Sequence, residues 1–98
     1  MQKFMLEVRI PDEIGPDFYA LIPSHREYID TLLTDGKISL YAINMDRTKG
    51  WVIVSAEDPD SAREILARSP LAGYLRIRAE ELFIYDAENL RLPKVSLN

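Results

Sequence analysis

The sequence contains no cysteine and a single histidine, His25, among its 98 residues. The absence of thiols excludes disulfide bonds, thiolate zinc sites and cysteine nucleophiles. With one imidazole, a metal site would depend on carboxylates, and no carboxylate cluster has the spacing of metal ligands. We therefore expect no metal and no other cofactor, so that any chemistry rests on the side chains themselves.

The chain also lacks a long apolar run and an excess of basic residues. No stretch approaches the roughly 18 apolar residues that a membrane-spanning helix requires. Twelve basic and 16 acidic residues give a net charge of −4, whereas domains that neutralise phosphates are usually basic. Residues 1–10 alternate apolar and polar side chains and do not resemble a secretion signal. We expect a cytoplasmic protein that binds neither membranes nor nucleic acid.

What the sequence does contain is a regular succession of strand and helix patterns. Residues 3–10 alternate apolar and polar side chains, which predicts a strand. Apolar residues then recur at helical spacing from Pro16 to Asp35, and Gly36 ends this predicted helix. Residues 37–45 and 50–56 are rich in β-forming residues and flank a short polar segment, which predicts a hairpin.

A second helix and a last strand follow the hairpin. Asp58 is expected to be the N-cap of this helix, with Pro59 in its first turn. The helix should end at Ser69, because the residue before a proline disfavours helical geometry. Residues 74–85 alternate again and predict the last strand, which would send Arg76 and Arg78 to one face.

The predicted order is βαββαβ, the ferredoxin-like arrangement of the α+β class. It consists of a four-stranded antiparallel sheet with two helices on one face. We expect a single domain over residues 1–86 and a C-terminal arm, residues 87–98, that contacts a partner subunit. The sheet face without helices carries both polar and apolar residues, which suits a two-fold dimer enclosing a partly polar cavity.

His25 is the first candidate for acid–base chemistry. It lies four residues before Ile29, on or beside the helix stripe that faces the sheet. If the helix breaks at Pro23, Ser24 becomes the N-cap of a new segment, and His25 and Arg26 occupy its first turn. Free amide groups there would bind a carboxylate and favour a neutral imidazole that accepts a proton. The alternative is a core histidine with one satisfied hydrogen bond.

Seven further residues are candidates for a site, each with a structural alternative. The arginines would receive a substrate carboxylate, although strand arginines commonly form cross-strand ion pairs or dimer contacts. The glutamate would act as a base if a dry cavity raised its pKa, although pairing with an arginine would prevent this. The aromatic residues would line a pocket, or belong to the core. The candidates are Glu7 as a catalytic residue and Arg9, Tyr41, Trp51, Arg76 and Arg78 as substrate-binding residues, together with Arg26.

Two segments resemble known families. EILARSPLAGYLRIRAEEL, residues 64–82, is similar to a segment of muconolactone isomerases in which a helix ends in a leucine-proline-leucine turn before an aromatic residue and a strand. Pro70, Leu71, Tyr74 and Leu75 keep this register, whereas Ser69 stands where the family usually has an apolar residue. HREYIDTLLTDGKI, residues 25–38, resembles the first helix of the same family and of YCII-type proteins, with a histidine eleven residues before a glycine.

This resemblance extends over residues 3–86 and implies a member of the dimeric α+β barrel superfamily. It implies a homodimer or a larger assembly of dimers, and a cofactor-free enzyme that isomerises a double bond in a small lactone or unsaturated organic acid by proton transfer. The hairpin NMDRTKGW departs from the pattern of muconolactone isomerases. Two alternatives remain: a non-catalytic ligand-binding or oligomerisation module, and a cofactor-free oxygenase of the same fold.

Overall fold

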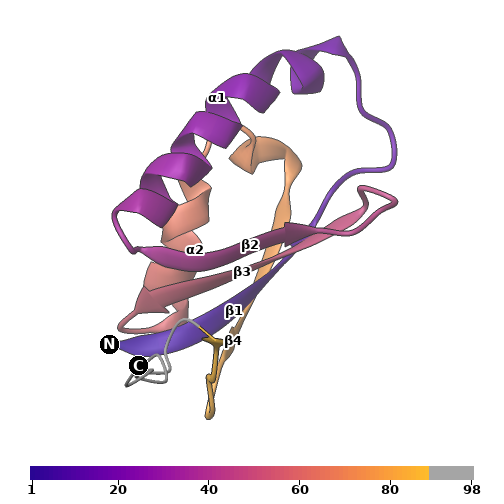
Figure 1. Cartoon of the computed structure of the whole chain (residues 1–98). Coiled ribbons are helices and arrows are strands. Elements are labelled where there is room, and N and C mark those ends of the chain that lie inside the picture. Colours follow the sequence, from indigo (N-terminus) through magenta and orange to yellow (C-terminus); the bar gives the residue numbers. More distant parts are fainter. Residues whose placement is uncertain (89–98) are drawn as a thin grey trace, which may run out of the picture.

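The computed structural model describes residues 1–88, and within them the predicted βαββαβ order is confirmed (Figure 1). The sheet order is β2-β3-β1-β4, and all neighbouring strands are antiparallel. Both helices lie on one face of the sheet. The elements are β1 (Gln2–Arg9), α1 (Pro16–Thr34), β2 (Ile38–Ile43), β3 (Lys49–Ala56), α2 (Pro59–Ala67), the short 3-10 helix η1 (Ala72–Tyr74) and β4 (Arg76–Glu81).

The predicted C-terminal arm, residues 87–98, lies outside the described residues apart from its first two positions. Within the described part, no helix has the length and apolar character needed to cross a membrane.

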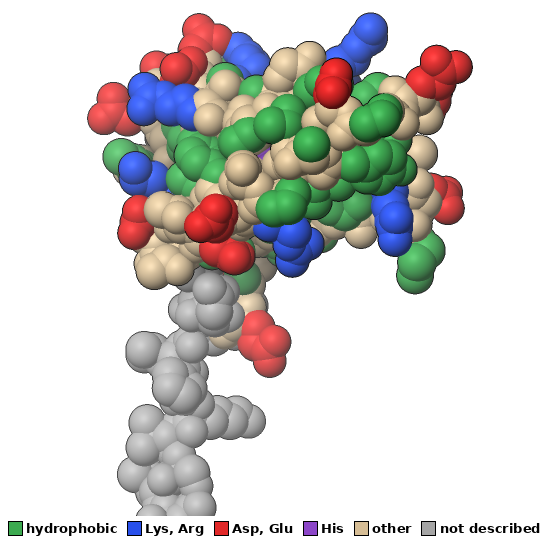
Figure 2. Space-filling model, turned by 90° about the horizontal axis from the view of Figure 1, so that it is seen from above, with side chains coloured by type: hydrophobic (Ala, Val, Ile, Leu, Met, Phe, Trp, Pro, Cys, Tyr) green, Lys and Arg blue, Asp and Glu red, His purple; other side chains and the backbone are tan. Residues whose placement is uncertain are grey.

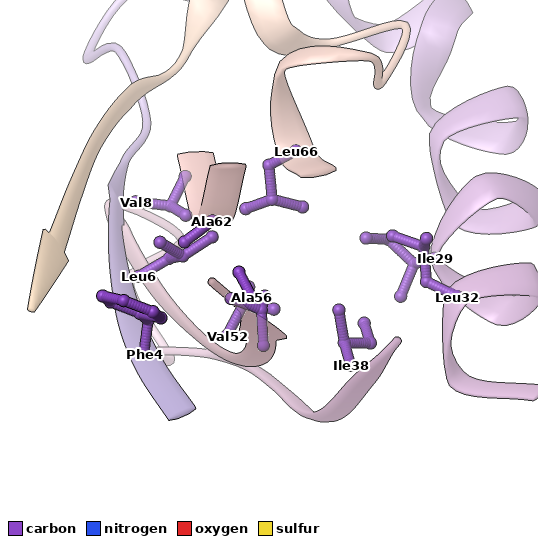
Figure 3. Close-up of a cluster of buried hydrophobic side chains, with 11 residues drawn as sticks. Phe4, Leu6, Val8, Ile29, Leu32, Ile38, Val52, Ala56, Ala62 and Leu66 are labelled. Carbon is purple, nitrogen blue, oxygen red and sulfur yellow. The ribbon is translucent and has the colours of Figure 1, made fainter. Parts of the chain in front are cut away.

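The core lies between the sheet and the two helices. Alternation along β1 sends Phe4, Leu6 and Val8 to the helix side, where all three are buried. Figure 3 shows these side chains converging with residues of β3 and of both helices. Each such side chain contributes about 1.5–3 kcal/mol when fully buried, so this layer holds the helices on the sheet. The other members of the cluster include Ile29, Leu32, Ile38, Val52, Val54, Ala56, Ala62 and Leu66.

The helix α1 continues through Pro23, so the break considered above does not occur and Ser24 is not an N-cap. A proline in a helix interior costs roughly 3 kcal/mol, because it removes a hydrogen bond and crowds the preceding turn. Phe18, Ile29 and Leu32 are buried on one face of α1, and their combined burial outweighs that cost. His25 therefore lies in mid-helix, away from the free amide groups of a helix start.

The last strand is shorter than the predicted range of 74–85. Tyr74 belongs to η1, where its N–H donates to the carbonyl of Leu71 at 2.9 Å. At the other end, the N–H of Leu82 donates to the carbonyl of Lys3 at 2.9 Å. β1 begins at Gln2, so the chain beyond Leu82 has almost no partner strand left with which to pair.

We call the sheet face away from the helices the open face. It carries Glu7 and Arg9 of β1, Leu40 of β2, Trp51 of β3 and Arg78 of β4, as the strand registers show. After β4 the chain crosses part of this face to the opposite edge of the sheet. There the hydroxyl of Tyr85 lies 2.7 Å from Ser39 Oγ, and the Lys3 ammonium lies 5.2 Å from the centre of the Tyr85 ring.

The ladder between β2 and β3 contains a register shift that decides where Tyr41 points. Ile38 pairs with Val54. In a regular ladder Leu40 would then pair with Val52, but it pairs with Ile53. Tyr41 consequently pairs with Val52, which is fully buried on the helix side. The irregularity is a β-bulge, which reorients the side chains that follow it. Tyr41 therefore faces α1 and not the open face.

Candidate functional site

His25 lies at the centre of a buried hydrogen-bonded group between α1 and the sheet. Its side chain is 5% exposed, because α1 directs it toward the sheet in the same stripe as Phe18 and Ile29. Nδ1 lies 2.5 Å from Ser69 Oγ, and Nε2 lies 2.9 Å from Tyr41 Oη. Both ring nitrogens thus have a hydrogen-bond partner. The alternative of a core histidine assumed only one such hydrogen bond.

Ser69 was not among the residues proposed from the sequence. It follows α2 and precedes Pro70, and its side chain is buried. Its Oγ accepts a hydrogen bond from the backbone N–H of Leu71 at 3.1 Å, in addition to its contact with His25. The signal in the sequence was its departure from the apolar residue usual at this place in muconolactone isomerases.

His25 and Tyr41 line a cleft of about 400 Å³. This size falls within the range of small-molecule sites, roughly 300–1,000 Å³. The cleft lies between the loop after β1, α1, β2 and the turn between β2 and β3, and its walls are largely apolar, with Ile10, Phe18 and Ile43 among them. Figure 2 views the side of the molecule that bears α1 and shows apolar side chains gathered across it, with most of the charged side chains toward its margins.

Two arginines, Arg26 and Arg47, belong to the polar part of the cleft. Arg26 follows His25 on α1, and Arg47 lies in the turn between β2 and β3. Within the described part of the chain, neither forms an ion pair with a carboxylate. Their guanidinium groups are therefore available to an anionic ligand, which arginine can bind through two parallel hydrogen bonds.

The backbone of Arg47 has φ 61°, in the left-handed region that non-glycine residues rarely adopt. Asn44 holds this turn, because its side-chain oxygen accepts hydrogen bonds from the N–H groups of Thr48 and Lys49 at 3.0 and 3.1 Å. The backbone N–H of Arg47 also donates to the Asn44 carbonyl at 3.0 Å. Sequence reasoning missed Arg47, because the direction of a turn residue depends on this hydrogen bonding.

The surroundings set the protonation of the central pair. Burial, followed by the positive charge of Arg26, lowers the pKa of His25 below its usual value of 6.5. Burial raises the pKa of Tyr41 above 10.0, although Arg26 acts in the opposite direction. At neutral pH the imidazole is uncharged and the phenol keeps its proton. The pair therefore combines a neutral imidazole with a hydroxyl group, which are the usual components of acid–base chemistry.

The structure brings three of the candidate residues together and separates the others from them. His25, Arg26 and Tyr41 line one cleft on the helix side. On the open face, Glu7 lies 3.5 Å from Lys49, and Arg78 lies 3.2 Å from Glu80. The remaining candidates of that face are Arg9 and Arg76, which stand opposite each other on β1 and β4, and Trp51, which stands opposite Glu7.

Tyr41 and Trp51 were expected to line one pocket, but they lie on opposite faces of the sheet. Across residues 1–88, no group of three or more histidine, aspartate and glutamate side chains is placed to hold a metal ion.

The fold is that of muconolactone isomerase. The crystal structure of that protein matches this chain with a TM-score of 0.67 and 15% sequence identity, covering 85% of this chain and 90% of muconolactone isomerase. At this identity the likeness establishes the fold and leaves the activity open. No protein-family model and no curated protein matches the sequence. The resemblance seen in residues 25–38 and 64–82 is thus confirmed at the level of the fold.

Proposed function

We propose that this chain is a cofactor-free enzyme that isomerises a double bond in a small lactone or unsaturated organic acid by proton transfer. The observation that carries the proposal is the hydrogen bond of 2.9 Å between His25 Nε2 and Tyr41 Oη, two residues that line the cleft. Either atom can donate or accept a proton, so the pair can act as the acid–base group. The muconolactone isomerase fold adds support for this class of reaction.

The substrate class follows from the remainder of the cleft. Apolar walls suit a short carbon skeleton, and Arg26 and Arg47 suit a carboxylate. When a proton leaves a carbon beside a carbonyl group, negative charge develops on the carbonyl oxygen. The two guanidinium groups and the hydroxyl of Tyr41 would stabilise that charge, which is commonly the largest contribution to such reactions.

The open face belongs to the proposal as the surface on which a second copy of the chain packs. It is mixed in character, with the apolar Leu40 and Trp51 among charged residues. Arg9, Arg76 and Arg78 would then contact the partner subunit or a carboxylate held between the sheets. Glu7 lies on this face beside Lys49, so our proposal places the chemistry at the cleft that contains His25 and Tyr41 and not at Glu7.

A specific observation favours a second candidate, a non-catalytic ligand-binding module. Both ring nitrogens of His25 are hydrogen-bonded, and among the described residues no buried side-chain nitrogen or oxygen lacks a partner. A satisfied network of this kind also specifies a unique core, without any chemistry. The two candidates differ in whether a proton of the bound molecule exchanges.

Binding is tested first, by measuring thermal stability in the presence of small lactones and unsaturated carboxylic acids. A ligand at 100 times its Kd stabilises the folded state by about 2.7 kcal/mol. Tyr41→Phe, which removes the hydroxyl at the cleft, should reduce this stabilisation. Tyr28→Phe is the matched control, because it also removes one tyrosine hydrogen bond, the 2.6 Å bond to the Ile65 carbonyl, and does not line the cleft.

Catalysis is tested on the compounds that bind, by following their C–H signals by NMR in deuterated water. The enzyme proposal expects the wild type to exchange a proton beside the carbonyl and to move the double bond, and expects His25→Gln to lose this exchange. Binding without exchange in the wild type would favour the non-catalytic module. Binding of no compound in either class would contradict both candidates.

A further inference from the structure

The hydrogen bonds through His25 run in one direction from donor to acceptor. The backbone N–H of Leu71, at one end of the series, determines this direction. The backbone N–H of Leu71 can only donate, so Ser69 Oγ accepts this bond at 3.1 Å. Ser69 also has a proton of its own, which requires an acceptor because the side chain is buried. Within the described residues the remaining partner of Ser69 Oγ is His25 Nδ1, at 2.5 Å.

Two arrangements of protons are possible at this contact. If Nδ1 carried the proton, Ser69 would accept both hydrogen bonds, and its own hydroxyl proton would be buried without a partner. If Nδ1 is unprotonated, the hydroxyl of Ser69 donates to it and every group is paired. A buried donor without a partner is unfavourable enough to shift such an equilibrium by about tenfold or more. The second arrangement is therefore the populated one.

The proton on the other nitrogen then determines what Tyr41 does. A neutral imidazole with an unprotonated Nδ1 carries its proton on Nε2, which donates to Tyr41 Oη at 2.9 Å. Tyr41 Oη is the acceptor of that bond, so its own proton points away from His25. Tyr41 lines the cleft, where a bound molecule can accept this proton in a hydrogen bond.

We infer that Ser69 fixes His25 in the tautomer protonated on Nε2, and that Tyr41 is thereby the residue that donates a hydrogen bond to a carbonyl or carboxylate oxygen in the cleft. The part concerning the bound oxygen rests on the proposed function, whereas the tautomer does not. Leu71 N–H, Ser69, His25 and Tyr41 form one series in which each member donates to the next. Donors in series polarise one another, which strengthens the last one.

The residues of the site then have different roles. Tyr41 contacts the oxygen on which negative charge develops, and His25 and Ser69 are positioning residues that act through it. A role for Nε2 as the base would require the other tautomer, which leaves the Ser69 hydroxyl without an acceptor. In the populated tautomer Tyr41 donates to the carbonyl oxygen, and the proton that leaves the carbon passes to solvent water in the cleft, which returns a proton at the new position of the double bond. Ser69 also stands where muconolactone isomerases usually have an apolar residue. The hydrogen bond to His25 accounts for a polar residue at this position in this chain.

The tautomer can be measured directly, because His25 is the only histidine in the sequence. Protein labelled with ¹⁵N in histidine gives one pair of ring nitrogen signals, whose chemical shifts and couplings to the ring protons distinguish a protonated from an unprotonated nitrogen. Above the pKa of His25 we expect the signal of a protonated nitrogen at Nε2 and that of an unprotonated, hydrogen-bonded nitrogen at Nδ1. The reverse assignment, or averaged signals from both tautomers, would overturn the inference.

Variants identify the cause of the preference. Ser69→Ala should move the Nδ1 signal toward that of a nitrogen without a hydrogen bond, whereas Ser69→Thr, which keeps the hydroxyl, should retain the wild-type shift. Tyr41→Phe should leave Nδ1 unprotonated, because the preference originates at Ser69. If Ser69→Ala does not fold, the wild type and Ser69→Thr still decide the question. An unchanged Nδ1 signal in a folded Ser69→Ala would contradict the role of Ser69.

This outcome is separate from that of the proposed function. The expected tautomer in a protein that exchanges no substrate proton would leave the hydrogen-bond series standing and reject the enzyme. The opposite tautomer in an active protein would reject the series and assign the base to His25 acting through Tyr41. In the active protein with the expected tautomer, Tyr41→Phe should reduce kcat by more than it changes KM, since the donated hydrogen bond strengthens as charge develops.

Discussion

Ile38 and Tyr41 point to the same face of the sheet although they are three residues apart. Ile38 pairs with Val54 and Tyr41 with Val52, and the register shift between β2 and β3 makes both pairings possible. In a regular strand, residues three apart point to opposite faces. Without this bulge Tyr41 would face away from α1, so the contact between Tyr41 and His25 depends on an irregularity of the strand.

Pro23→Ala should stabilise the protein, because α1 is continuous through this position. Alanine supplies an N–H group that can donate to the carbonyl of Tyr19 and removes the crowding by the proline ring. Alanine has more conformational freedom than proline in the unfolded chain, and this reduces the gain by less than about 1 kcal/mol. We expect the free energy of unfolding to rise by about 1–2 kcal/mol in urea denaturation.

Ser24→Ala is the companion experiment for the course of α1. Ser24 is exposed and lies inside the helix, so its replacement should change stability by less than about 0.5 kcal/mol. An N-cap serine would cost about 1 kcal/mol on the same replacement. A loss of that size, together with no gain in Pro23→Ala, would mean that the helix starts anew at Ser24.

Gly50→Ala should destabilise the protein and disturb the cleft. A Cβ at Gly50 would lie 2.6 Å from Cδ1 of Ile43 and 3.0 Å from the carbonyl oxygen of Ala42. The Ile43 side chain can rotate away, but it also lines the cleft, and the carbonyl cannot move easily. We expect a loss of about 1–3 kcal/mol in urea denaturation. Gly73→Ala, where nothing lies within 4 Å of the added atom, is the control, and equal stability of the two variants would refute this account.

The sequence predicted the features of the fold that are encoded locally. Alternation along β1 and helical spacing along α1 depend on the chain's own periodicity. The start of α2 was also predictable, because an aspartate N-cap acts within one turn, and Asp58 accepts the N–H of Ser61 at 2.7 Å. These signals were sufficient for the element order, and with it the sheet topology.

The candidate site was only partly predictable, because its decisive contacts join residues far apart in the chain. His25 was identified as a candidate, but its partner Ser69 is 44 residues away. The side of the sheet on which Tyr41 lies depends on a β-bulge in the pairing of β2 with β3. The sequence of β2 contains no local pattern that predicts this bulge. Arg47 enters the cleft through a turn whose geometry depends on the Asn44 side chain.

Leu40→Lys tests the proposed packing of a second copy on the open face. Leu40 and Leu33 are almost equally exposed, at 42% and 41%, but Leu40 lies on the open face and Leu33 on α1. An unpaired lysine buried in a subunit interface is unfavourable. We expect light scattering to show a dimer for the wild type and Leu33→Lys, and a smaller mass for Leu40→Lys. Equal masses for the two variants would place the interface elsewhere or exclude a dimer.

His25 should make the folded protein lose stability as the pH falls below about 6.5. Burial and the neighbouring Arg26 lower its pKa in the folded state, whereas the unfolded chain keeps the ordinary value of 6.5. Between these two values the unfolded chain binds a proton that the folded protein does not. The stability present above pH 6.5 is therefore lost as the pH falls toward the folded pKa. The cleft residues that face His25 include Arg26, Arg47 and Tyr41 and no carboxylate within the described part, so none of them compensates this loss.

His25→Gln isolates this effect, because glutamine retains hydrogen-bonding groups but does not titrate. The wild type should lose more stability than His25→Gln when urea denaturation is compared between about pH 8 and pH 5, the range in which histidine alone normally titrates. Since the sequence has one histidine, the difference between the two curves belongs to His25. A wild type that gains stability relative to His25→Gln as the pH falls would mean that the folded state favours the imidazolium ion, and the neutral imidazole required by the hydrogen-bond series would then be wrong.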